Sequence, residues 1–135
     1  MTEYVLDTDT CIYWLNGDAA VEGEILRVGT GKVAITVITE CELVYGAQKS
    51  SRPDDNLGVV ERLRSVLRVI HTNPEVAPVY GTTKAQLERQ GRRLDDADLL
   101  IAAIARSIGA TLVTNNTRHF ERVPGLRLEN WRPSS

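Results

Sequence analysis

Long apolar runs, paired cysteines and a strong net charge are all missing from this sequence of 135 residues. No stretch approaches the roughly 20 consecutive apolar residues that cross a bilayer, and the first residues lack the basic segment and apolar run that direct secretion. We therefore expect a cytoplasmic protein with no membrane partner. The two cysteines, Cys11 and Cys41, lie far apart without C-x-x-C spacing, so the sequence indicates neither a redox pair nor a zinc site.

The net charge is −2, so the composition lacks the strong positive charge that is typical of nucleic-acid-binding domains. Basic residues do gather locally, among them Arg92 and Arg93 before a group of acids, and Arg118 after a polar segment. A solvated surface is the simpler explanation before any motif is considered, because a charged fraction of 25% is ordinary.

Hydrophobic residues make up 42% of the chain, and its length is that of one ordinary domain with one core. Short apolar strands are expected at residues 4–6, 33–37, 69–71 and 111–114. A helix is expected over 59–67, where apolar residues that include Val66 form one core-facing stripe. Further helices are expected over 74–90, ending at Gly91, and in the apolar segment that ends at Gly109. Apolar strands joined by helices predict an α/β fold with a central, mostly parallel sheet and helices on both faces.

Acidic residues follow these predicted strands. The stretch YVLDTDTC places Asp7 and Asp9 directly after the first strand, and ITECE places Glu42 after the second. The segment DADLL places Asp98 in the first turn of a helix, and TNNT follows the last strand. Because the carboxyl ends of parallel strands share one rim, where ligands of open sheets collect, we expect these acids to meet there.

Each acid also has a structural explanation of its own. Thr39 and Glu42 match the T-x-x-E pattern of a capping box. Asp95 can cap the helix in which Asp98 is the third residue, and Asp9 can cap a short helix over 10–15. Singly, each acid is more often a cap than a catalyst, but caps have no reason to converge.

Three clustered carboxylates need a proton or a cation, since two unit charges about 4 Å apart repel by about 4 kcal/mol at an effective dielectric near 20. Hard oxygen ligands without a neighbouring Cys or His pattern favour Mg²⁺ or Mn²⁺ over Zn²⁺. Such a cation can orient a water and stabilise charge on a phosphate. The predicted chemistry is hydrolysis of a phosphodiester or phosphomonoester.

One interpretation of DTDT is the D-x-D-x-T motif, in which the chain resembles the haloacid-dehalogenase-like phosphatases. That resemblance implies Asp7 as nucleophile and Asp9 as general acid. It also requires a strand before the later acids, whereas LERQGRRL is helical and basic, and a lysine that balances the phosphate, whereas Lys84 lies within a predicted helix. This phosphatase is an alternative function.

A second resemblance uses more of the chain. The segments YVLDTDTCIYWL, ITVITECELVYGAQKS and DADLLIAAIARSIGATLVTNNTRHFERVPGLRLENW closely resemble, in order and spacing, the PIN-domain ribonucleases, and within them the VapC toxins of toxin–antitoxin pairs. The match runs from Tyr4 to Trp131. It implies a single PIN domain over residues 1–135, with the three-layer α/β fold of that family.

The resemblance also implies roles for the acids. Asp7, Glu42 and Asp98 match the first, second and third acids of the family, which act as magnesium ligands or water-orienting groups. Of these, Asp7 and Asp98 are the expected metal ligands, with Glu42 acting directly or through water.

The chain departs from the family pattern at two positions. Asp9 stands where the family commonly has Asn, and His119 stands where a fourth acid is usual, which leaves a second metal in doubt. Asn116 and Thr114 are expected to offer neutral oxygens, Asp96 to compensate from the start of its helix, and His119 either to contact the scissile phosphate or to be an ordinary surface residue.

The implied function is that of a Mg²⁺-dependent endoribonuclease toxin of a type II toxin–antitoxin system, with structured RNA, foremost tRNA, as substrate. Cleavage would leave a 5′-phosphate and a 3′-hydroxyl. Arg92, Arg93 and Arg118 are the candidates for holding RNA. The implied partners are a VapB-type antitoxin and a second copy in a homodimer.

Two further alternatives stay open. Ribonucleases that use two histidines leave a cyclic phosphate, and His71 and His119 are available, although their segments give no reason to pair them. A catalytically silent module that only binds its antitoxin or RNA is the other alternative.

Overall fold

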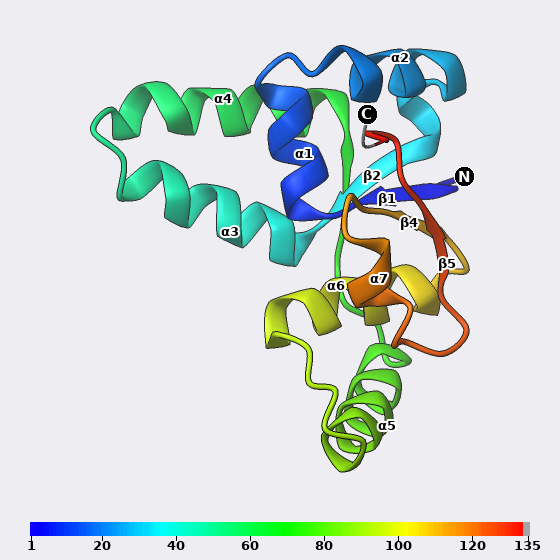
Figure 1. Ribbon diagram of the computed structural model, residues 1–135. Coiled ribbons are helices and arrows are strands. Elements are labelled where there is room, and N and C mark those ends of the chain that lie inside the picture. The colour runs from blue at the N-terminus through cyan, green and yellow to red at the C-terminus, as the bar shows by residue number, and fades with distance from the viewer. Residues whose placement is uncertain (134–135) are drawn as a thin grey trace.

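The computed structural model describes residues 1–133 and contains a five-stranded, wholly parallel sheet. Its strands are β1 (Tyr4–Leu6), β2 (Val33–Thr36), β3 (Arg68–Ile70), β4 (Thr111–Val113) and β5 (Arg127–Glu129). They lie in the order β3-β2-β1-β4-β5 (Figure 1). The predicted α/β architecture is confirmed.

Helices cover both faces of the sheet. They are α1 (Thr8–Leu15), α2 (Ala19–Val28), α3 (Val37–Gln48), α4 (Pro53–Val66), α5 (Val76–Arg89), α6 (Asp96–Ser107) and α7 (Thr117–Phe120), with a short 3₁₀ turn at Thr30–Lys32. Figure 1 shows α1 to α4 on one side of the sheet and α5 to α7 on the other. Within residues 1–133, none of these helices has the length and apolar character needed to cross a membrane.

The strands contribute side chains to two apolar layers, one on each face of the sheet, because successive side chains of a strand point to opposite faces. Leu6 packs with Ile25 and Leu63 on the α1–α4 side, whereas its neighbour Val5 packs with Phe120 on the α5–α7 side. Burying each such side chain contributes roughly 1.5 to 3 kcal/mol. These two layers fix the sheet between the helices and so fix the positions of its strand ends.

Several predicted boundaries were wrong by one or two residues. The strand expected at 33–37 ends at Thr36 because Val37 already belongs to α3, and the third strand covers 68–70 instead of 69–71. The helix expected over 74–90 begins at Val76, but Gly91 and Gly109 adopt φ angles of 66° and 68°, as expected after helix ends. Val66, predicted to face the core, is 49% exposed.

Helices α2 and α7 and strand β5 were not predicted. Helix α2 begins after Asp18, whose carboxylate accepts hydrogen bonds from the backbone N–H groups of Ala20 and Val21. That cap, followed by Val21 and Ile25 four residues apart, is the sequence signal that could have revealed the helix. Strand β5 is too short and too exposed to show a periodic pattern.

The strand order places a topological switch point between β1 and β4. From β1 the chain builds outward through β2 and β3, and it then returns to place β4 and β5 on the other side of β1. Crevices at such points, beyond the carboxyl ends of the strands, are where open α/β sheets bind ligands.

Candidate active site

A cavity of about 220 Å³ lies at this switch point. Its walls come from the segments that follow β1 and β4 and from helices α1, α3, α6 and α7. The residues that line it are Asp7, Thr8, Asp9, Glu42, Asp95, Asp98, Asn116 and Phe120. The three acids singled out in the sequence therefore share one cavity, although they come from three separate segments.

Asp7 leaves β1 and caps α1 at the same time. Its Oδ1 accepts a hydrogen bond of 2.8 Å from the backbone N–H of Thr10, and the residue is 5% exposed. Burial raises the pKa of Asp7, while hydrogen bonding from Thr114 and Thr10 acts in the opposite direction. The cap expected at Asp9 was wrong, because Asp7 caps this helix and Asp9 is an exposed residue of its first turn.

Glu42 is not part of a capping box. Helix α3 begins after Thr36, whose hydroxyl accepts from the backbone N–H of Thr39, so Glu42 lies in the second helical turn. There its Oε1 accepts a hydrogen bond of 2.6 Å from the hydroxyl of Thr8, which also lies 3.0 Å from the hydroxyl of Thr39. Sequence reasoning missed Thr8, and the hydroxyl between Asp7 and Asp9 in DTDT is the signal that could have identified it.

Asp98 is the third residue of α6, as expected, and Asp95 occupies the N-cap position. The pKa of Asp98 is raised to about 6, first by burial and then by the negative charge of Asp95, with Asp7 and Glu42 adding to the effect. His119 lowers it, since Nε2 lies 3.4 Å from Oδ2 of Asp98. Burial and the neighbouring carboxylates together thus disfavour the ionised form of Asp98.

The donor set suits a hard, hydrated cation. Carboxylate oxygens predominate in the cavity, and their mutual repulsion is relieved by a positive charge. Within the described part of the chain, no three Asp, Glu, His or Cys side chains come close enough together to hold one ion directly. The arrangement therefore fits a cation that keeps several waters and takes one or two carboxylates, which is the usual behaviour of Mg²⁺ in proteins.

The segment after β4 contributes neutral groups. Asn116 lines the cavity, and the hydroxyl of the buried Thr114 accepts from the backbone N–H of Asn116 at 3.0 Å. His119 contacts Asp98 and packs edge-on against Phe120, with ring centroids 5.4 Å apart. His119 is not among the residues that line the cavity.

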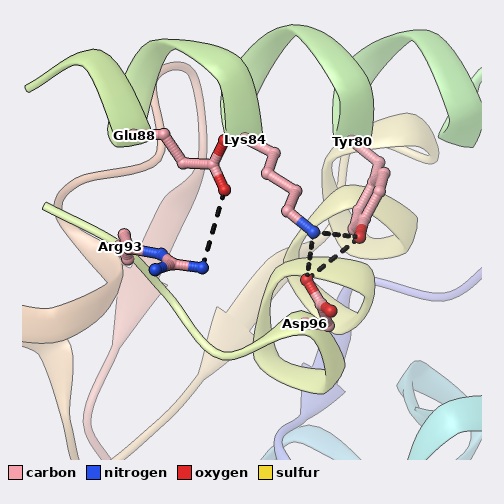
Figure 2. Close-up of polar contacts among 5 residues, drawn as sticks. All are labelled: Tyr80, Lys84, Glu88, Arg93 and Asp96. Atoms are coloured by element: carbon pink, nitrogen blue, oxygen red, sulfur yellow. Dashed lines mark hydrogen bonds and ion pairs between the residues drawn. The ribbon is translucent and has the colours of Figure 1, made fainter. Parts of the chain in front are cut away.

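Asp96 does not line this cavity. It accepts hydrogen bonds from Lys84 Nζ at 2.8 Å and from the hydroxyl of Tyr80 at 3.0 Å (Figure 2). The acid that reaches the cavity from the start of α6, besides Asp98, is Asp95. Lys84 is also engaged with Asp96, on α6, and not with the acids after β1 that the phosphatase interpretation requires.

The three candidate RNA-binding arginines are exposed. Arg92 and Arg93 lie in the loop before α6, and Arg118 lies in α7. Arg93 is 3.8 Å from Glu88 across the loop (Figure 2).

A family model described as the PIN domain matches residues 4–126. The chain is 43% identical over 131 residues to the tRNA(fMet)-specific endonuclease VapC of Shigella flexneri, with 97% of this chain and 99% of the relative covered. It is 41% identical over 131 residues to ribonuclease VapC2 of Haemophilus influenzae strain Rd, with the same coverage.

Comparison with solved structures also finds VapC toxins, in complexes with their antitoxins. The DNA-bound VapBC of Salmonella typhimurium superposes with a TM-score of 0.91 at 39% identity, covering 97% of this chain and 99% of that chain. The promoter-bound VapBC2 of Rickettsia felis superposes with a TM-score of 0.88 at 34% identity, covering 96% and 99%.

Proposed function

The chain belongs to the PIN-domain family and, within it, to the VapC ribonucleases, and from this premise we propose that it is a Mg²⁺-dependent endoribonuclease toxin acting on structured RNA, foremost tRNA. The observation that carries the proposal is the convergence of Asp7, Glu42 and Asp98, from three segments, in one cavity at the switch point of the sheet. Relatives over nearly the full length are named as tRNA-specific endonucleases, which supports tRNA as substrate.

The residues of the cavity have distinct roles in this proposal. Asp7 and Asp98 would hold Mg²⁺, or Mn²⁺ in its place, and the cation would supply positive charge at the scissile phosphate and help to activate water. Glu42, fixed by the hydroxyl of Thr8, accepts a hydrogen bond from the attacking water and orients it. Asn116 offers a neutral amide to the same water or to a phosphate oxygen. In-line attack leaves a 5′-phosphate and a 3′-hydroxyl.

The exposed arginines bind the RNA. A cavity rich in carboxylates repels a polyanion, so positive side chains around it are needed to bind substrate. Arg92, Arg93 and Arg118 are exposed and can meet this need.

The partners follow from the solved relatives, which are VapBC toxin–antitoxin complexes. We propose that a VapB-type antitoxin binds this chain and blocks its active site, that residues 1–135 make up one PIN domain, and that two copies form a homodimer. The cytoplasm, where tRNA is found, is the proposed location.

The test is cleavage of total tRNA by wild type, Asp7→Asn and Asp98→Asn, with Mg²⁺ or with EDTA, followed by analysis of the product ends. Wild type with Mg²⁺ should give 5′-phosphate ends, and either substitution or EDTA should reduce the rate by 100-fold or more. Glu61→Gln, which removes an exposed charge from α4, is the matched control and should cleave normally. Cyclic phosphate ends formed in EDTA would point to histidine chemistry, and clean wild-type protein without activity would point to a silent binding module.

A further inference from the structure

A second cavity adjoins the active site. It has a volume of about 350 Å³, within the range of ligand pockets, and lies between α5, the loop before α6 and the first turn of α6. Asp95 lines both this cavity and the active-site cavity, so the two meet at that residue. A group bound in the second cavity would therefore lie beside the reacting phosphate.

The floor of the second cavity is apolar. Leu87 and Leu99 are 2% and 1% exposed, and Leu94, at 9%, covers them from the loop. All three belong to the core beneath the sheet. Such a floor accepts a flat apolar face, and the face of a nucleobase is one.

The rim of this cavity carries charged side chains of both signs, some of which form ion pairs with one another (Figure 2). Lys84 is held by Asp96 at 2.8 Å and by the hydroxyl of Tyr80 at 3.2 Å, and these contacts raise the pKa of Lys84. Arg93 and Glu88 are 3.8 Å apart, with side chains 77% and 46% exposed.

An exposed pair at that separation adds little to stability, so both side chains can turn to a ligand at small cost. The second cavity also presents more carboxylates than cations, because Glu88, Asp95 and Asp96 face Lys84 and Arg93. Its rim is therefore better supplied with hydrogen-bond acceptors than with donors.

We propose that the second cavity takes one unpaired base of the RNA substrate, close to the scissile phosphate, and favours bases with an exocyclic amino group over uracil. The base lies on the leucine floor, its amino group donates to Glu88 or Asp95, and Arg93 donates to a ring nitrogen or carbonyl. Adenine, cytosine and guanine each have an amino group that can donate to a carboxylate. Uracil instead presents two carbonyl oxygens on either side of one N–H, and carboxylates repel these oxygens. This inference rests on the proposed function, since it names how the same enzyme selects its RNA.

The test uses an RNA pool with an unpaired randomised segment and sequences the product ends made by wild type, Glu88→Gln and Glu61→Gln. In the wild type, one position near the cut should be depleted of uridine about tenfold or more, the usual effect of losing one base-specific contact. Glu88→Gln, which keeps the shape but adds a donor, should reduce that depletion to less than threefold. Glu61→Gln should keep the wild-type preference.

Each other outcome has a definite meaning. Cleavage without a position that disfavours uridine, or a depletion that Glu88→Gln leaves unchanged, overturns the inference and leaves the proposed function standing. Absence of cleavage that depends on Asp7 overturns the proposed function, and the inference with it. Because Glu88 lies on the exposed surface of α5, its substitution should leave the thermal midpoint close to that of wild type, which distinguishes a specificity effect from misfolding.

Discussion

Asp98 carries a carboxyl group whose surroundings disfavour its charged form. Burial, Asp95 and the two other acids of the cavity together raise its pKa to about 6, and His119 offsets only part of this. The metal-free protein therefore loses stability at this position when Asp98 ionises. Such a cost is common where side chains are arranged for binding or catalysis and not for stability.

The stability of the metal-free protein should depend on pH through Asp98. The native pKa is raised from 3.8 to about 6, so between these values the native state binds more protons than the unfolded state, and the free energy of unfolding falls as pH rises. Asp98→Asn removes this loss. With a side chain 33% exposed, we expect the variant to be roughly 1 to 2 kcal/mol more stable than wild type at pH 7.5, with the gain absent near pH 4.

Urea unfolding in EDTA at pH 4 and pH 7.5 measures this difference. Asp54→Asn, at an exposed position in the first turn of α4, is the control and should show no comparable gain at pH 7.5. A gain for Asp98→Asn of equal size at both pH values would mean that charge is not its cause.

At the scale of elements, the contact between α1 and α3 decides where Glu42 points. Thr8 is the first residue of α1, and its hydroxyl donates to Glu42 in the second turn of α3. The sequence predicted that Asp7 and Glu42 follow strand ends on the same rim of the sheet, because both strands are apolar and acidic residues come directly after them. It could not predict this hydrogen bond. The T-x-x-E pattern indicates a helix that begins after Thr39, whereas the helix begins after Thr36, whose hydroxyl accepts from the backbone N–H of Thr39.

The sequence also did not predict which side of α6 faces the active site. Three acids, Asp95, Asp96 and Asp98, stand at the start of this helix, and the sequence predicted Asp98 and Asp96 as site residues and Asp95 as a cap. Packing of the helix on the sheet decides that Asp95 and Asp98 face the active site, whereas Asp96 faces Lys84. Successive helical residues point about 100° apart, so a pattern of acids alone cannot choose among them.

Thr8→Val should lower the rate of RNA cleavage by about 10- to 100-fold, the usual cost of losing a group that orients a catalytic side chain. The substitution leaves Glu42 without its short hydrogen bond but keeps the volume of the side chain. Thr8→Ser keeps the hydroxyl and should retain most of the activity. Single-turnover cleavage at saturating RNA measures the effect, and equal rates for the valine and serine variants would show that Thr8 does not orient Glu42.

At the scale of the whole molecule, strand order brings the site together. Apolar strands joined by helices were enough to predict a parallel sheet, but they did not give the order β3-β2-β1-β4-β5. That order makes β1 and β4 neighbours, with Leu6 opposite Val113, so that Asp7 and Thr114 follow adjacent strands. The order depends on how all the helices share the two faces, which no single segment determines.

The whole fold should respond to a divalent cation through its active-site cavity. A ligand that binds only the native state stabilises it by about 2.7 kcal/mol at a free concentration of 100 times its Kd, which corresponds to a rise in Tm on the order of 10 °C for a domain of this size. Mg²⁺ or Mn²⁺ added to metal-free wild type should give a rise of this kind, because it compensates for the burial and the carboxylate repulsion that raise the pKa of Asp98. Asp7→Asn and Asp98→Asn should remove most of the rise. Glu42→Gln should keep a larger part, since Glu42 is held by Thr8 and acts on the water, and Glu61→Gln should keep all of it.

Thermal melts over a metal titration measure these shifts without any RNA. If Asp7→Asn were stabilised as strongly as wild type, the cation would be binding elsewhere, and the role given to the three acids would have to be abandoned even for a protein that cleaves RNA.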